Sequence, residues 1–159
     1  MKINIYFFLI LFCGIFLFSG CDKARVYEEY NNIPENLWNI KNIQKFKFSI
    51  DDPNLKYNIL YNVRNSASYP YYNLFLKYTI TDEKGTIISS NLQDLKLMDP
   101  KTGEPQGKGM GDIFDNQILS LSSVKFPQKG EYTFTIQQYM RQDPLPDIMS
   151  IGIRVEKVE

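Results

Sequence analysis

The sequence predicts an all-β protein: an antiparallel β-sandwich of about seven or eight strands that follows a signal peptide and a short tether. Three observations support this fold class. Short runs alternate apolar and polar residues with a period of two, turn-forming residues separate these runs, and hardly any stretch shows a helical pattern. Apolar residues make up 43% of the 159 residues and aromatic residues 14%, which is enough for a packed core. The predicted sandwich covers residues 43–159.

The stretch Tyr57–Thr81 is the central element of this prediction. Two alternating runs flank the polar residues 65–68, whose types favour a turn, and we interpret the whole stretch as a β-hairpin. The pattern of residues 118–126 fits either a helix or a strand. Similar alternation predicts further strands over residues 46–50, 86–90, 131–140 and 151–155.

A segment rich in glycine and proline, residues 99–111, interrupts the strands. Long loops in compact domains are often functional, so Gly109, Gly111 and the adjacent Asp112 are candidate contacts for a partner or ligand. The segment lacks the spacing and the βαβ context of a phosphate-binding loop. Asp112 and Asp115 offer carboxylates for calcium, but their spacing does not match an EF-hand. We prefer a capping role for them at a helix or turn.

Aromatic residues form a second group of candidate contacts. Trp38 is the only tryptophan of the chain, and Tyr69, Tyr71 and Tyr72 surround Pro70. Such side chains can stack on a sugar ring or on a partner's proline. Burial and cross-strand pairing explain them more simply, and we expect Trp38 to fasten the end of the tether onto the sandwich.

Residues 1–20 have the pattern of a bacterial lipoprotein signal peptide. Lys2 precedes an almost wholly apolar run over residues 5–18, which is short for a transmembrane helix. Small residues then lead directly to Cys21, which is the expected lipidation site. The alternatives are an uncleaved anchor and plain secretion. Because Cys13 leaves with the signal peptide, no internal disulfide is expected.

Residues 21–42 are polar and lack a clean period. We interpret them as the lipidated cysteine followed by a tether with one turn of helix at Glu35–Trp38, where Pro34 suits a first helical position. A flexible segment of this length has an end-to-end distance of about 25 Å. The tether would therefore let the domain stand off the bilayer.

The charge balance and the absence of histidine exclude several function classes. Lys and Arg number 18, Asp and Glu number 18, and histidine is absent. Balanced charge gives no indication of nucleic-acid binding. Without histidine, Ser–His–Asp and Cys–His catalysis and His-based zinc sites are excluded. We predict no catalytic residue, cofactor or metal site. A glycosidase-like carboxylate pair is the remaining enzymatic alternative, and turn chemistry explains its candidates: Asp51, Asp52, Asp112, Asp115 and Asp143.

Several stretches resemble one family. They are YNVRN at 61–65, YPYYNLFL at 69–76, GKGMGDIFDN at 107–116, FPQKGEYTFTIQQYMRQDPLPDI at 126–148 and SIGIRVEK at 150–157. With the lipoprotein-type start, they are similar to the GldH family, the gliding-motility lipoproteins of Bacteroidetes-type bacteria. The likeness runs in order along nearly the whole mature chain. It departs from the family pattern at Pro105-Gln106, where a Trp and an aliphatic residue are expected, and at Asp147, where glycine is common.

The resemblance implies a lipoprotein of the cell envelope, anchored through palmitate and related acyl chains on Cys21 to the outer membrane rather than the inner. It implies a non-catalytic component of the gliding machinery, which is linked to type IX protein secretion. The implied partners are the membrane and other envelope proteins of that machinery, with no nucleic acid. The alternative function is that of a surface glycan-binding lipoprotein that uses exposed Tyr and Trp side chains.

Overall fold

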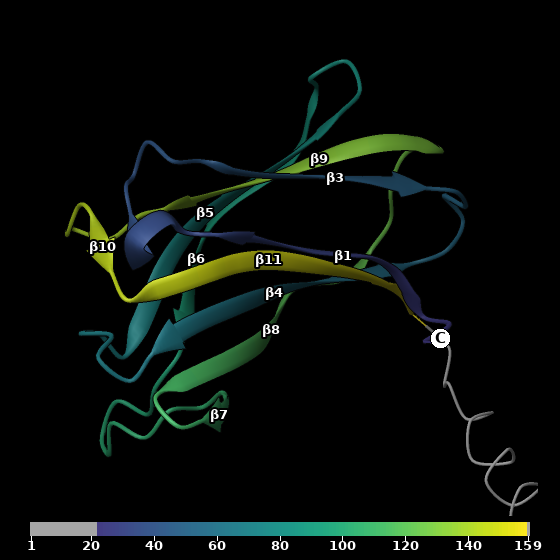
Figure 1. Cartoon of the computed structure of the whole chain (residues 1–159). Helices are drawn as coiled ribbons and strands as arrows, with labels where there is room; N and C mark the ends of the chain where they lie inside the picture. Colours follow the sequence, from purple (N-terminus) through teal and green to yellow (C-terminus); the bar gives the residue numbers. More distant parts are fainter. Residues whose placement is uncertain (1–21, 159) are drawn as a thin grey trace, which may run out of the picture.

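The computed structural model describes residues 22–158 and shows a two-layer β-sandwich (Figure 1). The described residues also contain a single 3-10 turn, η2 (Pro34–Asn36), and in residues 22–158 no helix has the length and apolar character needed to cross a membrane. The strands are β1 (Arg25–Asn32), β2 (Leu37–Trp38), β3 (Gln44–Ile50), β4 (Tyr57–Ser66), β5 (Asn73–Asp82), β6 (Ile87–Lys96), β7 (Lys108–Met110), β8 (Ile113–Val124), β9 (Gly130–Gln138), β10 (Leu145–Pro146) and β11 (Ile148–Lys157).

Two antiparallel sheets make up the layers. The five-stranded sheet has the order β1-β11-β4-β8-β7, and the four-stranded sheet has the order β3-β9-β5-β6. The short strands β10 and β2 pair with each other outside both sheets. This arrangement confirms the predicted all-β sandwich.

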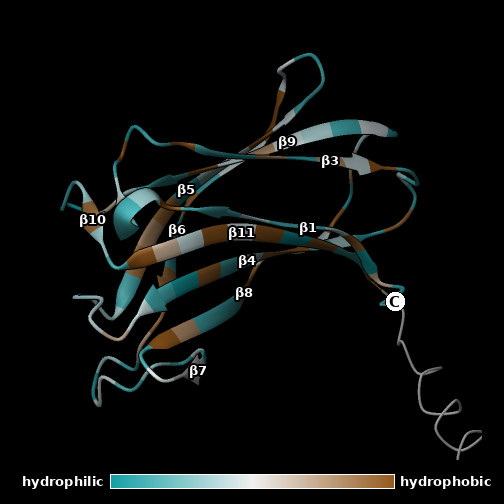
Figure 2. Ribbon diagram, viewed as in Figure 1, coloured by the Kyte–Doolittle hydropathy of each residue, from teal (hydrophilic) through white to brown (hydrophobic). Residues whose placement is uncertain are grey.

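The core lies between the two sheets, and the strands contribute alternate residues to it. In β3 and β9 every second residue is buried, as expected where one face of a sheet is packed and the other is wet. Phe134 of β9 stacks on Tyr78 of β5 with ring centroids 5.4 Å apart, and it meets Tyr61 of β4 edge-on at 6.0 Å. Aromatic contacts therefore join the layers. Figure 2 shows hydrophobic residues along the middle of β11.

The prediction of a hairpin over residues 57–81 is wrong. Both alternating runs are strands, but β4 pairs with β11 and β8, whereas β5 pairs with β6 and β9. The connection between them crosses from one sheet to the other. Each run alternates because one of its faces points into the shared core, and a period of two does not specify which strand lies alongside.

Much of the predicted tether belongs to the folded domain. β1 is an edge strand that pairs with β11 along its length, and Trp38 in β2 is fully buried. Because β1 lies at the edge of its sheet, all of its residues are half-buried or exposed, so its sequence lacks a clean alternation. The first strand of the sandwich begins at Arg25. The predicted lipidation site, Cys21, lies outside the described residues.

The ambiguous residues 118–126 belong mainly to β8, so the strand interpretation is correct. Asp112 lies in the two-residue connection between β7 and β8, and Asp115 lies within β8. Neither caps a helix. Residues 99–107 are largely irregular, as predicted, apart from an isolated bridge between Met98 and Pro105, but residues 108–110 of the predicted loop form strand β7.

Candidate interaction surfaces

Two of the predicted aromatic contacts are buried and cannot reach a ligand. Trp38 has no exposed surface, and its indole Nε1 donates to the Asn42 carbonyl at 2.8 Å. Tyr69 is 3% exposed and donates its hydroxyl to the Asn73 carbonyl at 2.9 Å. Both side chains fasten a chain segment to the core. Trp38 thus has the fastening role expected of it, although the segment that it holds is part of the domain.

The other two tyrosines reach the surface but do not form a flat platform. Tyr71 is half-buried and donates to Gln142 Oε1 at 2.6 Å, and its ring is tilted 70° from that of Tyr69. Tyr72 is 46% exposed, and the Lys96 ammonium lies 4.8 Å from its ring centroid. Stacking on a sugar requires an open ring face. At Tyr72 a lysine occupies one face.

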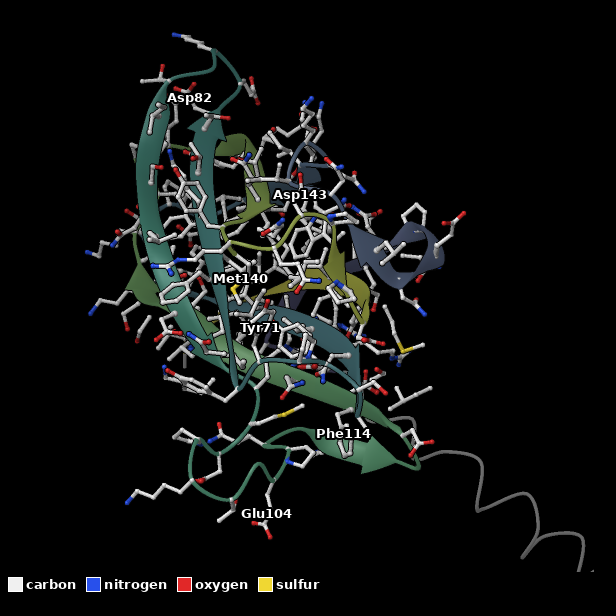
Figure 3. All side chains as sticks on the ribbon, turned by 90° about the vertical axis from the view of Figure 1, so that its left-hand side faces the viewer. Tyr71, Asp82, Glu104, Phe114, Met140 and Asp143 are labelled. Carbon is white, nitrogen blue, oxygen red and sulfur yellow. The ribbon has the colours of Figure 1, made fainter. Side chains whose placement is uncertain are left out.

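Tyr71 instead helps to line an apolar pocket on the outer face of the four-stranded sheet. The pocket has a volume of about 400 Å³. Figure 3 shows Tyr71 and Met140 together on this side of the molecule. We refer to the lining residues as the apolar patch: Tyr71, Phe75, Leu92, Tyr139, Met140 and Arg141.

Backbone contacts hold the apolar patch together. The Tyr139 N–H donates to the Phe75 carbonyl at 2.8 Å, and the Phe75 N–H lies 3.3 Å from Met140 Sδ. Three of the side chains remain substantially exposed: Phe75 at 37%, Leu92 at 47% and Tyr139 at 51%. Sequence reasoning missed these three. The available signal was that Phe75 is apolar at a position of β5 where alternation predicts a wet side chain.

A second, polar groove lies beside the glycine-rich loop. It has a volume of about 550 Å³ and includes the residues Arg64, Lys96, Lys108 and Asp115 in its lining. Arg64 binds Asp115 through two hydrogen bonds of 2.7 and 3.1 Å, and the pair is exposed. The carboxylate of Asp115 thus has an arginine as its partner, and no metal is needed to account for its position. The groove therefore carries more positive than negative charge.

The predicted contacts Gly109, Gly111 and Asp112 stand next to this groove without lining it. A Cβ on Gly109 would lie 2.4 Å from the Phe114 ring, so this glycine permits close packing of the ring. Gly111 has a φ of 64° in the β7–β8 turn, a conformation that favours glycine. The Asp112 carbonyl accepts from the Ala67 N–H at 2.8 Å. The observed contacts of these residues shape the loop.

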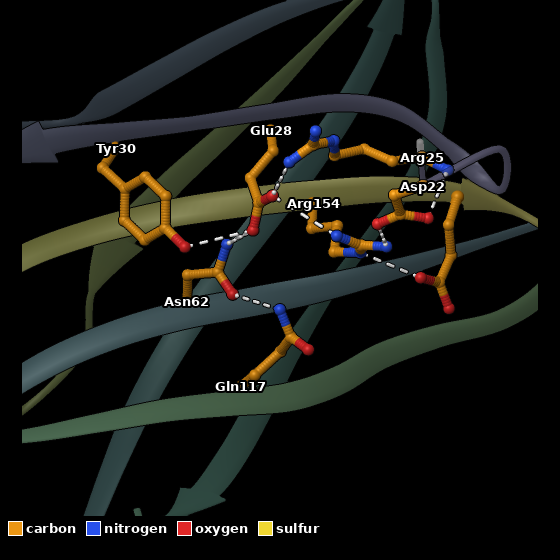
Figure 4. Close-up of polar contacts among 8 residues, drawn as sticks. Asp22, Arg25, Glu28, Tyr30, Asn62, Gln117 and Arg154 are labelled. Carbon is orange, nitrogen blue, oxygen red and sulfur yellow. Dashed lines mark hydrogen bonds and ion pairs between the residues drawn. The ribbon is translucent and has the colours of Figure 1, made fainter. Parts of the chain in front are cut away.

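The outer face of the five-stranded sheet carries a network of charged side chains centred on Arg154 (Figure 4). This side chain is 14% exposed and binds three carboxylates: Asp22 at 2.5 Å, Glu156 at 2.9 Å and Glu28 at 3.3 Å. Burial alone would lower the pKa of Arg154, but its hydrogen bonds to Asp22 and Glu156 raise it. The guanidinium thus joins residues from β1, β11 and the start of the described chain.

Glu28 connects this network to β4. It accepts hydrogen bonds from Arg25, Tyr30 and Asn62, each at 3.1 Å. Burial raises the pKa of Glu28, but the hydrogen bonds from Arg25 and Tyr30 and the charge of Arg154 together bring it below its ordinary value. The carboxylate is thus held in its charged form, as a structural group requires.

Most of the carboxylates considered as a catalytic pair have structural contacts. Asp51 lies 3.5 Å from Lys129, Asp52 accepts from the Asn54 N–H, and Asp143 accepts from the Ile40 N–H. Within residues 22–158 no group of three or more His, Cys, Asp or Glu side chains is arranged to hold a metal ion.

The fold and these surfaces define a single-domain β-sandwich that presents its candidate contacts on open outer faces. A model of the GldH lipoprotein family matches residues 25–155. The chain is 36% identical to a gliding motility lipoprotein GldH homolog of Christiangramia forsetii and 31% identical to the gliding motility lipoprotein GldH of Flavobacterium johnsoniae, over 94% of each chain. This chain belongs to the GldH lipoprotein family, a family of gliding motility lipoproteins.

Solved structures show weaker similarity. A family GH115 4-O-methyl-alpha-glucuronidase, BtGH115A, has a TM-score of 0.41 at 12% identity over 87% of this chain and 18% of that chain. The K1 cleaved adhesin domain of Lys-gingipain from Porphyromonas gingivalis W83 has a TM-score of 0.34 at 11% identity over 88% of this chain and 86% of that chain. Scores this low carry no functional argument.

Proposed function

We propose that this protein is a non-catalytic component of the gliding motility machinery, linked to type IX protein secretion. Acyl chains on Cys21 hold it on a membrane of the cell envelope, the outer membrane rather than the inner. The observation that carries the proposal is the match to two GldH lipoproteins along 94% of each chain. A likeness of this extent covers most of the sandwich and part of the segment before it.

The apolar patch is the surface that we assign to contact with another envelope protein of the machinery. Its lining combines Tyr, Phe, Met, Leu and Arg side chains. Aromatic residues, Met and Arg are enriched at the centre of protein–protein interfaces, where burial of such side chains supplies most of the binding energy. Exposed apolar side chains gathered in one place on a monomer favour the same interpretation.

Two of the four aromatic residues that the glycan-binding alternative requires are buried in the core. Trp38 and Tyr69 are buried, and a lysine lies over the ring of Tyr72. The apolar patch offers the rings of Tyr71, Phe75 and Tyr139. A protein partner fits this mixture of aromatic, aliphatic and sulfur-containing side chains better than a sugar ring does.

Deletion of the gene, followed by rescue with variants, tests the proposed function. We expect deletion to stop surface spreading or export of type IX cargo, and we expect Cys21→Ala to fail to rescue despite normal protein levels. If deletion leaves spreading and export unchanged, the proposed role is wrong.

The assignment of the apolar patch has its own test. We expect the double variant Phe75→Asp and Leu92→Asp to reach normal levels in the envelope and to fail to rescue. Ile87→Asp is the matched control, because Ile87 is 64% exposed on the same strand as Leu92 but lies outside the patch. Rescue by the double variant would contradict the assignment. Binding of the wild-type domain to a polysaccharide, lost in the double variant, would support the glycan alternative.

A further inference from the structure

The start of the described chain is fastened to one end of the sandwich. Arg154 Nη2 donates to Asp22 Oδ2 at 2.5 Å, and the Lys157 N–H donates to the Ala24 carbonyl at 2.7 Å. Figure 1 shows the start of β1 and the end of β11 side by side at this end. Asp22 directly follows Cys21, and one residue spans at most about 3.6 Å. A lipid on Cys21 would therefore hold this end of the domain at the bilayer.

Four exposed lysines surround this attachment point. None of them forms an ion pair with another of the residues 22–158. Strand pairing brings them together, because Tyr57 at the start of β4 pairs with the end of β8 and the end of β11. Lys56, Lys125 and Lys157 lie at or next to these strand ends, and Lys23 precedes β1, whose start pairs with the end of β11.

Three nearby carboxylates pair with other cations. Asp22 and Glu156 bind Arg154, and Asp51 lies 3.5 Å from Lys129. Leu55, which precedes one of the four lysines, is 36% exposed. This end of the sandwich thus presents four exposed lysines, without ion pairs among residues 22–158, around an exposed apolar side chain.

We propose that the end of the sandwich bearing Lys23, Lys56, Lys125 and Lys157 lies against an anionic lipid surface, with the lysines at the headgroup phosphates. We call it the lysine end. The inference rests on the proposed lipidation of Cys21 and adds an orientation to it. An acyl anchor combined with basic residues is a known basis for stable membrane attachment, and anionic headgroups attract Lys within a Debye length of about 8–10 Å.

The orientation has a consequence for the candidate surfaces. The apolar patch is built from the start of β5 and the segment after β9, which lie at the end of the sandwich opposite the lysine end. In this orientation the apolar patch points away from the bilayer and remains accessible to another envelope protein.

Fluorescence quenching of the lipidated full-length protein in vesicles tests the orientation. The vesicles contain phosphatidylcholine and phosphatidylglycerol with a headgroup-level quencher, and a fluorophore is attached to a single introduced cysteine, Leu55→Cys or Glu104→Cys. Glu104 is exposed in the loop that precedes β7, at the opposite end. We expect several-fold stronger quenching at residue 55. Equal quenching at the two positions overturns the proposal.

A charge-reversal variant tests the role of the lysines. We expect simultaneous substitution of Lys23, Lys56, Lys125 and Lys157 by Glu to lower the quenching at residue 55 to near the level at residue 104. Unchanged quenching overturns the role of the lysines. The matched control reverses four exposed lysines elsewhere and is expected to leave the quenching unchanged: Lys41, Lys77, Lys101 and Lys108.

The same preparation separates failure of this inference from failure of the proposed function. Mass spectrometry of the purified chain shows whether Cys21 carries acyl chains. If it carries none, the proposed anchoring is wrong. If Cys21 is acylated and the two labelled positions are quenched equally, the anchoring stands and the orientation alone is wrong.

Discussion

The outer faces of the two sheets differ in the side chains that they present. On the five-stranded sheet, Arg154 and Glu28 are 14% and 15% exposed, form an ion pair with each other and bind residues of neighbouring strands. On the four-stranded sheet, Phe75, Leu92 and Tyr139 remain at least 37% exposed, and no described side chain covers them. The strands of the first sheet engage their charged groups with one another, although they also expose Tyr30 and Leu119 at 52% each, whereas the second sheet gathers exposed apolar side chains around one pocket.

This difference indicates which face is structural and which is available. A network of charged groups that is largely removed from water stabilises a fold only when each group has partners, and the Arg154 network meets that condition. Exposed apolar side chains add nothing to the folded monomer until something covers them. Substitutions on the five-stranded face are therefore expected to change stability, and those on the four-stranded face to change binding.

The largest expected effect is that of Gly152→Val on the five-stranded face. A Cβ at Gly152 would lie 2.4 Å from the Glu29 carbonyl oxygen and 3.0 Å from the Tyr30 ring. Because a backbone atom of β1 would have to move, we expect the free energy of unfolding to fall by about 3 kcal/mol in denaturant titrations. Gly103→Val is the control, since its φ of 74° costs about 1 kcal/mol but its surroundings are open. Equal losses in the two variants would contradict the clash.

Arg154→Met is expected to have the next largest effect. It leaves Asp22, Glu28 and Glu156 without their shared cation, and we expect unfolding free energy at neutral pH to fall by about 2 kcal/mol. Arg64→Met removes a partner of Asp115 in an exposed pair, so its effect should stay below about 1 kcal/mol. A smaller loss for Arg154→Met than for Arg64→Met would show that the network is not structural.

The pH dependence of stability tests the ionic contribution of the Arg154 network. The pKa of Glu28 in the folded chain lies below its ordinary value of 4.5, so the unfolded chain binds more protons as the pH falls. The stabilisation is complete above pH 4.5 and is lost as the pH falls through the lowered pKa. We expect the stability difference between wild type and Arg154→Met to shrink below pH 4.5, as measured by denaturant titration at successive pH values. A difference independent of pH would contradict an ionic origin.

The smallest effect on stability is expected for Leu92→Asp on the four-stranded face. Leu92 is 47% exposed, so we expect its replacement to change the unfolding free energy by no more than about 0.5 kcal/mol. Leu76→Ala, at a fully buried position of the adjacent strand β5, should cost about 2–5 kcal/mol under the same conditions. A large loss for Leu92→Asp would mean that the apolar patch is part of the monomer's core.

Particular residues show how far the sequence predicted the candidate surfaces. Tyr71 was predicted as a contact and does reach the apolar patch, but Phe75 and Tyr139 were missed, since single exposed apolar residues are common and their clustering depends on how strands are placed. Trp38 was predicted to fasten a segment, and its burial agrees with that role. The Arg154–Asp22 contact joins residues 132 positions apart, which no local pattern specifies.

The sequence by itself determined most of the segments that become strands, which of their faces are apolar, and the family to which the chain belongs. Alternation of polar and apolar residues carries that information because each strand has one wet and one buried face. Only the tertiary structure decided that β4 and β5 belong to different sheets and that β1 completes a sheet edge. Strand pairing depends on backbone hydrogen bonds that nearly all residues can make, so it is settled by how the whole chain packs around one core.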